Sequence, residues 1–133
     1  MQTLFVDTNI GYEAVNEAAD AGNKVWAMGV NMDQSLTVPK YASVILTSMI
    51  KRVDIATYDV AKEVSKNTFQ GGKIVEFVLK EDGVGIAATS SNNVPKDVLD
   101  LVQKYSDAIK SGKLVITAKK GEATNFYDPT DIK

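Results

Sequence analysis

The 133-residue sequence contains no cysteine and no histidine. Without them it can form no disulfide, and it offers neither a thiol nucleophile nor the usual ligands of a structural zinc site. Histidine is also the side chain that most often transfers protons in enzymes. We find no convincing pair of carboxylates that could replace it, and therefore expect no catalytic residue, no metal ion and no cofactor.

The sequence also lacks a strong excess of charge. Fifteen basic residues oppose 17 acidic ones, for a net charge of −2 and a pI near 5.1. This balance argues against nucleic acid or an anionic membrane as the main partner. Residues 1–6 resemble neither a signal peptide nor a transmembrane span. We therefore expect the chain as given to be soluble, without signal or anchor.

The apolar pattern alternates between strand and helix along the chain. A short strand over 4–6 leads into a helix that Thr8 or Asn9 can cap, that continues through Ala21 and that Gly22 ends. A strand over 25–30 follows. Because the connection is short and both strands appear buried, we expect a parallel β-α-β unit in an α/β fold with a mostly parallel sheet.

The same reading extends to the rest of the chain. It predicts a β-hairpin around Glu81-Asp82-Gly83, formed by segments 73–79 and 84–88. The other predicted elements are a strand over 43–46, an amphipathic helix over 48–66, a helix over 95–109 and a strand over 114–118. Residues 119–133 form a polar tail.

Polar residues follow the ends of two predicted strands, where open α/β sheets bind their ligands. Gly29, Asn31 and Asp33 close the first strand, and Lys51 follows the second. The Asp33 carboxylate would suit a pair of ligand hydroxyls, because an ionised group accepts strong hydrogen bonds. The alternative for Asp33 is that it caps its own turn. Lys51 is expected in a helical first turn, where a lysine is usually solvated. Because the helix dipole disfavours a cation there, Lys51 could instead be tied to a ligand oxygen or to a carboxylate such as Asp33.

Two further positions could contact a ligand. Gly11 lies at a predicted helix N-terminus, where free backbone N–H groups can hold polar atoms, although simple capping is the alternative. Phe5, near a strand end, is a candidate for stacking on a ligand, with core packing as the default. Trp26, in mid-strand, is expected in the core.

Four motifs occur in order along the chain: GVNMDQ (29–34), LTSMIKRVD (46–54), FQGG (69–72) and DGVGI (82–86). With them the sequence resembles the basic membrane protein family, which comprises solute-binding lipoproteins of ABC transporters typified by the purine nucleoside receptor. There are two departures. Asn31 stands where the family usually has aspartate, and only Gly11 remains of a glycine-rich turn before the first helix.

The resemblance implies that residues 1–118 form a Rossmann-like lobe of a type I periplasmic-binding-protein fold, followed by the tail 119–133. It also implies that the chain covers only the C-terminal part of a two-lobed protein. The helix over 48–66 would ordinarily pack on the other lobe. In this chain the apolar stripe of the helix must pack on another partner or stay exposed. We expect a homodimer through Met49, Val53, Val60 and Val64.

The implied function is that of a non-enzymatic substrate-binding component of an ABC transporter, which binds a purine nucleoside and works with a permease in the full-length protein. By resemblance, Asp33 and Lys51 would grip ribose hydroxyls, Gly29 would admit the ligand close to the backbone, and Phe5 would stack on the base. Full-length relatives are lipid-anchored at the outer face of the bacterial cytoplasmic membrane or periplasmic. The alternative is a sensory or regulatory module that uses the same fold with weak or no ligand binding.

Overall fold

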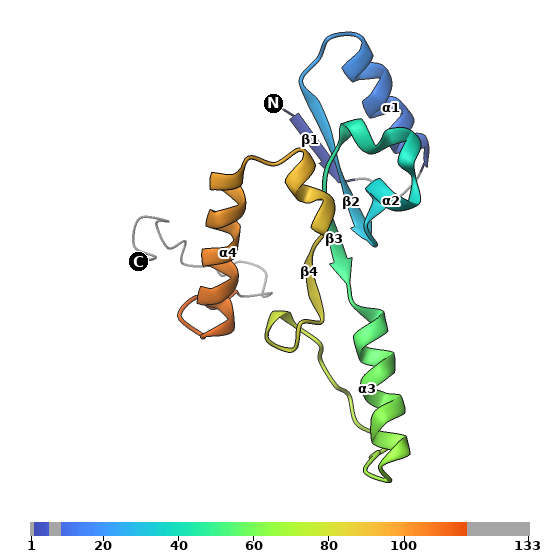
Figure 1. Ribbon diagram of the computed structural model, residues 1–133, viewed down its shortest axis with the longest axis vertical. Coiled ribbons are helices and arrows are strands. Elements are labelled where there is room, and N and C mark those ends of the chain that lie inside the picture. The colour runs from blue at the N-terminus through green and yellow to red at the C-terminus, as the bar shows by residue number, and fades with distance from the viewer. Residues whose placement is uncertain (1, 6–8, 117–133) are drawn as a thin grey trace. The chain divides into compact units, whose positions relative to one another are not determined.

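The computed structural model describes residues 2–5 and 9–116. It divides into two compact units, Met1–Val94 and Pro95–Lys133. The first unit contains a four-stranded sheet in the order β1-β2-β3-β4 (Figure 1). Its strands are β1 (Gln2–Phe5), β2 (Val25–Asn31), β3 (Ile45–Lys51) and β4 (Val84–Ile86).

The predicted parallel unit is present. Helix α1 (Asn9–Asp20) lies between β1 and β2 in the chain, and these two strands are parallel, as are β2 and β3. The mostly parallel sheet with flanking helices confirms the expected α/β, periplasmic-binding-protein-like lobe. Because β1, β2 and β3 run in one direction, their carboxyl ends meet at one edge of the sheet.

The core lies on the face of the sheet that α1 covers. Tyr12 and Val15 of α1 pack there against Ala27 of β2 and Ile45 of β3. A 3₁₀ helix, η1 (Pro39–Val44), adds two buried residues. The ring of one of them, Tyr41, stacks on that of Tyr12 at 5.9 Å between centroids. Stacked aromatic rings at this separation stabilise a core beyond the area that they bury.

The boundary predicted between the strand over 43–46 and the helix over 48–66 is wrong. Strand β3 continues to Lys51, and helix α3 occupies Val53–Ser65. The reason is tertiary: the second half of β3 pairs with the antiparallel strand β4, and Ser48 is completely buried. Pairing with a neighbouring strand therefore overrides the helical periodicity of the local sequence.

The hairpin predicted around residues 81–83 is wrong. Residues 73–78 form no strand, η2 (Leu79–Glu81) is a 3₁₀ turn, and β4 pairs with β3 instead. Asp82 has a φ of 54°. A Cβ on Gly83 would lie only 2.4 Å from the Cβ of Phe77. The chain therefore reverses through a tight turn in which a side chain at position 83 would clash with Phe77. Because β4 pairs with β3, no hairpin forms at this turn.

Helix α3 follows β3 directly and carries no buried residue (Figure 1). Val53, Val60 and Val64 are 66%, 44% and 55% exposed. Because these three residues recur at helical spacing, they form one apolar stripe, which we call the α3 stripe. Met49, which we expected on it, belongs to β3.

In the second unit, α4 (Lys96–Lys110) confirms the helix predicted over 95–109. It ends at Lys110 and is followed by Gly112, with a φ of 75°, and the Leu114 N–H donates to the Ala108 carbonyl at 3.0 Å. The described part of the strand predicted over 114–118 is not a strand. Its last two residues and the tail 119–133 lie outside the described residues. None of the helices that the structure describes combines the length and apolar character needed to cross a bilayer.

Candidate functional site

Asp33 lies just beyond the carboxyl end of β2, at the N-cap position of the short helix α2 (Gln34–Thr37), and its carboxylate does not cap that helix. The alternative reading, in which Asp33 caps its own turn, is therefore wrong. Instead, the Thr89 hydroxyl donates to Asp33 Oδ1 at 2.7 Å, and the Thr89 N–H is 3.4 Å from Oδ2. Thr89 belongs to the 3₁₀ helix η3 (Ala88–Asn92), which follows β4.

The Asp33 carboxylate is half-buried and keeps room for further donors. An ionised carboxylate offers about four lone-pair sites, of which Thr89 engages two. The remaining sites lie at the edge of a parallel sheet, where α/β proteins bind small molecules. The described hydrogen bonds of Asp33 thus use two of its roughly four acceptor sites, and a ligand contact of this carboxylate stays a prediction.

The residue after Asp33 has a structural role. The Gln34 side chain donates to the Val30 carbonyl at 2.8 Å and accepts from the Tyr12 hydroxyl. Its backbone N–H donates to Ser48 Oγ at 3.2 Å. With its amide thus engaged on both sides, Gln34 holds the β2–α2 connection against the sheet and α1.

Gly29 is buried in β2, and its neighbours explain the absence of a side chain. An added Cβ would lie 2.4 Å from Ser48 Oγ and 3.0 Å from the Cβ of Gln34. Only glycine lets the Ser48 hydroxyl approach Gln34 at this point of the sheet. The close approach of a ligand to Gly29 stays a prediction.

Asn31 ends β2 and has a φ of 74°. Asparagine and aspartate tolerate this left-handed conformation better than most residues. The backbone alone therefore accounts for an Asn here and for the Asp that the resemblance leads us to expect. A ligand contact of the exposed Asn31 side chain remains a prediction.

Lys51 is the exposed last residue of β3 and pairs with Val84 of β4. It does not lie in a helical first turn, so the conflict with a helix dipole that we expected does not arise. Within residues 2–5 and 9–116, the structure gives Lys51 no ion pair and does not join it to Asp33. The next residue, Arg52, bonds to Asp54 at 2.8 Å and lowers the pKa of that carboxyl below its usual range.

Gly11 lies in the first turn of α1, as predicted. Phe5 is the last residue of β1 and pairs in register with Met28. Gly11, Phe5 and Asp33 thus follow or end neighbouring parallel strands on the side of their carboxyl ends. The ligand contacts proposed for Gly11 and Phe5 stay predictions.

A polar cluster on η3 and its flanks was missed by the sequence reading. The hydroxyls of Thr47 and Ser90 are 2.6 Å apart, and both residues are buried. The Asn93 side chain donates to the Ile45 carbonyl at 2.7 Å. The available signal was the run of hydroxyl residues Thr89-Ser90-Ser91, which begins three residues after the end of β4, because polar residues that follow a strand are candidates for its edge.

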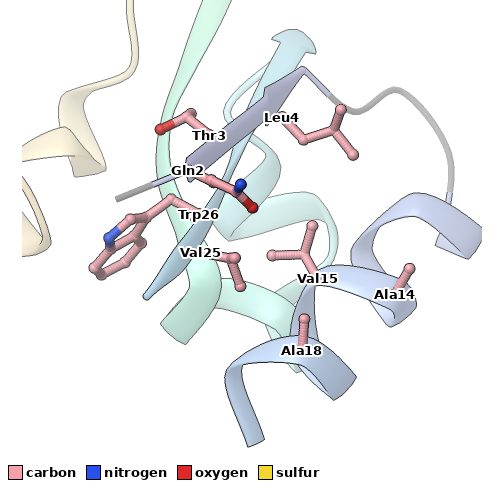
Figure 2. Close-up of a pocket in the computed structure, with 8 residues that line it drawn as sticks. All are labelled: Gln2, Thr3, Leu4, Ala14, Val15, Ala18, Val25 and Trp26. Atoms are coloured by element: carbon pink, nitrogen blue, oxygen red, sulfur yellow. The ribbon is translucent and has the colours of Figure 1, made fainter. Parts of the chain in front are cut away.

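An open hollow of about 440 Å³ lies elsewhere, beside β1 and the first half of β2 on the α1 side (Figure 2). Trp26, which we expected in the core, is half-buried and lines it. Its other lining residues are Gln2, Thr3, Leu4, Ala14, Val15, Ala18 and Val25. None of the candidate ligand residues belongs to this hollow, which is mainly apolar. In the part of the chain that the structure describes, no group of three or more acidic residues could hold a metal ion.

Comparison with known proteins identifies the family to which the chain belongs. A family model described as "ABC transporter substrate-binding protein PnrA-like" (Bmp) matches residues 6–120. A "CD4+ T-cell-stimulating antigen" of Listeria monocytogenes is 37% identical over 106 residues, which cover 75% of this chain and 29% of that protein. The "ABC transporter nucleoside-binding protein BmpA" of Lactococcus lactis is 32% identical over 114 residues, covering 80% and 31%.

An uncharacterized lipoprotein of Pyrococcus abyssi is 30% identical, with 85% of this chain and 35% of that protein covered. The chain therefore spans about a third of the length of these curated relatives. The match confirms the resemblance drawn from the four motifs. Because the family model covers most of its sequence, the chain belongs to the PnrA-like (Bmp) family of ABC transporter substrate-binding proteins.

Proposed function

We propose that the chain is the C-terminal lobe of the substrate-binding component of an ABC transporter, and that its ligand is a purine nucleoside or a related small solute. Family membership and the nucleoside-binding name of the Lactococcus relative support this function over a sensory or regulatory module. The observation that carries the proposal is the Asp33 carboxylate, which is half-buried at the carboxyl edge of β2 and does not cap α2.

In this proposal the protein binds its ligand and does no chemistry on it. Asp33 accepts hydrogen bonds from two ribose hydroxyls, and Lys51 offers its ammonium group to a ligand oxygen. Gly29, Asn31 and Gly11 contribute backbone or amide contacts. Phe5, at the end of β1, stacks on the base.

The α3 stripe is the surface through which this lobe meets the rest of the protein. A monomer rarely leaves a row of large apolar side chains uncovered, and two-thirds of the length of the relatives lies outside this chain. We propose that α3 packs on the other lobe in the full-length protein, and that a second copy covers it when the chain is alone. The full-length protein would be lipid-anchored outside the cytoplasmic membrane and deliver its ligand to a permease.

Calorimetric titration with inosine, guanosine and adenine tests the ligand assignment. We expect both nucleosides to bind more tightly than the free base. Asp33→Asn should weaken nucleoside binding on the order of 10- to 100-fold, because a hydrogen bond to a charged group contributes about 1.5–3 kcal/mol. Glu17→Gln, which removes one exposed carboxylate from α1, is the control and should leave the affinity unchanged. Equal affinities of the wild type and Asp33→Asn would refute the assignment.

A further inference from the structure

The described polar contacts of the Asp33 side chain come from Thr89, which lies 56 residues away in the sequence. The 2.7 Å separation between the Thr89 hydroxyl and Asp33 Oδ1 is near the short distances of hydroxyl-to-carboxylate bonds, which are among the stronger hydrogen bonds in proteins. Both residues are half-buried, so water competes for this bond less than it would at an open surface.

Thr89 is itself held in place by contacts between η3 and β3. At the start of η3, the Ala87 N–H donates to the Ser48 carbonyl at 2.9 Å. Next to Thr89, the Ser90 hydroxyl lies 2.6 Å from Thr47 Oγ1 and 2.6 Å from the Ala87 carbonyl oxygen. Ser90 is only 2% exposed. These bonds fix Ala87, two residues before Thr89, and Ser90, the residue after it.

The far end of η3 is anchored as well. The Asn93 side chain donates to the carbonyls of Ile45 at 2.7 Å and Ala42 at 3.3 Å. Both ends of η3 are thus hydrogen-bonded to β3 or to η1, which precedes β3. The Thr89 hydroxyl therefore occupies a fixed position relative to the carboxyl edge of the sheet.

An aspartate at an N-cap ordinarily turns its carboxylate to the free N–H groups of its own helix. Asp33 does not, although it occupies that position on α2. The donor that holds it elsewhere is Thr89. A carboxylate held in one orientation before binding loses less conformational entropy when the ligand arrives.

We propose that Thr89 is a positioning residue that orients Asp33 toward the paired hydroxyls of the ligand. This inference rests on the proposed function, because it assigns Asp33 to ligand binding. Thr89 acts only through Asp33 and touches no ligand atom. Its hydroxyl is needed and its methyl group is not, so serine can replace it and valine cannot.

Guanosine titrations of the 133-residue chain test this inference. Thr89→Val keeps the shape but removes the hydroxyl, and should weaken binding about 10-fold. Thr89→Ser restores the hydroxyl and should bind within about twofold of wild type. Ser91→Ala removes an exposed hydroxyl from the same turn and should change nothing. Wild-type affinity in Thr89→Val, or a loss in Thr89→Ser as large as in Thr89→Val, would overturn the proposal.

A second measurement needs no ligand and separates this inference from the proposed function. Urea unfolding of Asp33→Ala, Thr89→Val and the double variant gives the coupling between the two side chains. We expect each single change to raise the unfolding equilibrium constant, the ratio of unfolded to folded chain, about 5- to 10-fold, and the double change to raise it no more than the larger single one. Fully additive effects would overturn the positioning role. Coupled effects in a chain that binds no nucleoside would refute the proposed function alone.

Discussion

Two regions of the first unit depart from the usual pattern of buried apolar and exposed polar side chains, each in a different way. Around β3 and η3, polar side chains such as Ser48 and Ser90 are buried. Among the described residues, no buried side-chain nitrogen or oxygen lacks a hydrogen-bond partner. Along α3, the side chains of the α3 stripe are exposed and no residue of the helix is buried. Buried polar groups and exposed apolar rows are the informative departures from a generic globular surface.

The difference shows which part of the lobe is complete in itself. The β3–η3 region satisfies its polar groups internally, so its geometry depends on no outside partner. The α3 stripe leaves apolar area in contact with water, which costs about 25 cal/mol for each Å² until something covers it. The candidate ligand residues thus lie beside a region whose buried polar groups are satisfied within the lobe, and α3 is the element for which we propose a partner.

The largest effect should follow from filling the space at Gly29. Gly29→Ala places a Cβ 2.4 Å from Ser48 Oγ and should destabilise the chain by about 2–3 kcal/mol, because the packed neighbours must move. Urea unfolding followed by circular dichroism measures this change. In Gly85→Ala the new Cβ meets nothing within 4 Å, so stability should change by less than about 0.5 kcal/mol. If both variants were equally stable, the tight packing between β2 and β3 would be disproved.

A smaller loss should come from Ser90→Ala, which removes a buried hydroxyl and leaves Thr47 Oγ1 without its described partner. We expect a loss of about 1–2 kcal/mol in the free energy of unfolding. The matched change on α3 is Ser65→Ala, whose exposed hydroxyl donates to the Lys62 carbonyl at 2.8 Å. It should cost less than about 0.5 kcal/mol. Equal costs would mean that the two regions do not differ in how they use hydroxyls.

The smallest effect on stability, and the clearest on assembly, should come from the α3 stripe. The wild-type chain should self-associate in light scattering across a concentration series. Val53→Asp and Val60→Asp should make it monomeric while changing its unfolding free energy by less than about 0.5 kcal/mol, because these side chains are exposed. Ser65→Asp adds the same charge off the stripe and should leave association intact. A wild-type chain that is monomeric at high concentration would contradict the proposed docking role of α3.

Local signals in the sequence predicted much of the scaffold. The pattern around Gly22 located α1 and β2, the approach to Pro95 located α4, and the four motifs identified the family. Asp33 was selected because it follows a buried strand, and the structure places it at the expected edge of the sheet. These signals succeed because capping, periodicity and strand ends depend on residues within a few positions of one another.

The remaining features depend on residues that only folding brings together. Strand β3 reaches Lys51 because β4, more than 30 residues further along, pairs with it. Gly29 is required by Ser48, and Asp33 is oriented by Thr89, across 19 and 56 residues of sequence. The composition and motifs thus determined the class of fold and the family, and they selected Asp33 as the candidate acceptor. Only the tertiary structure decided how that carboxylate is held, because a hydrogen bond between distant residues leaves no local pattern in the sequence.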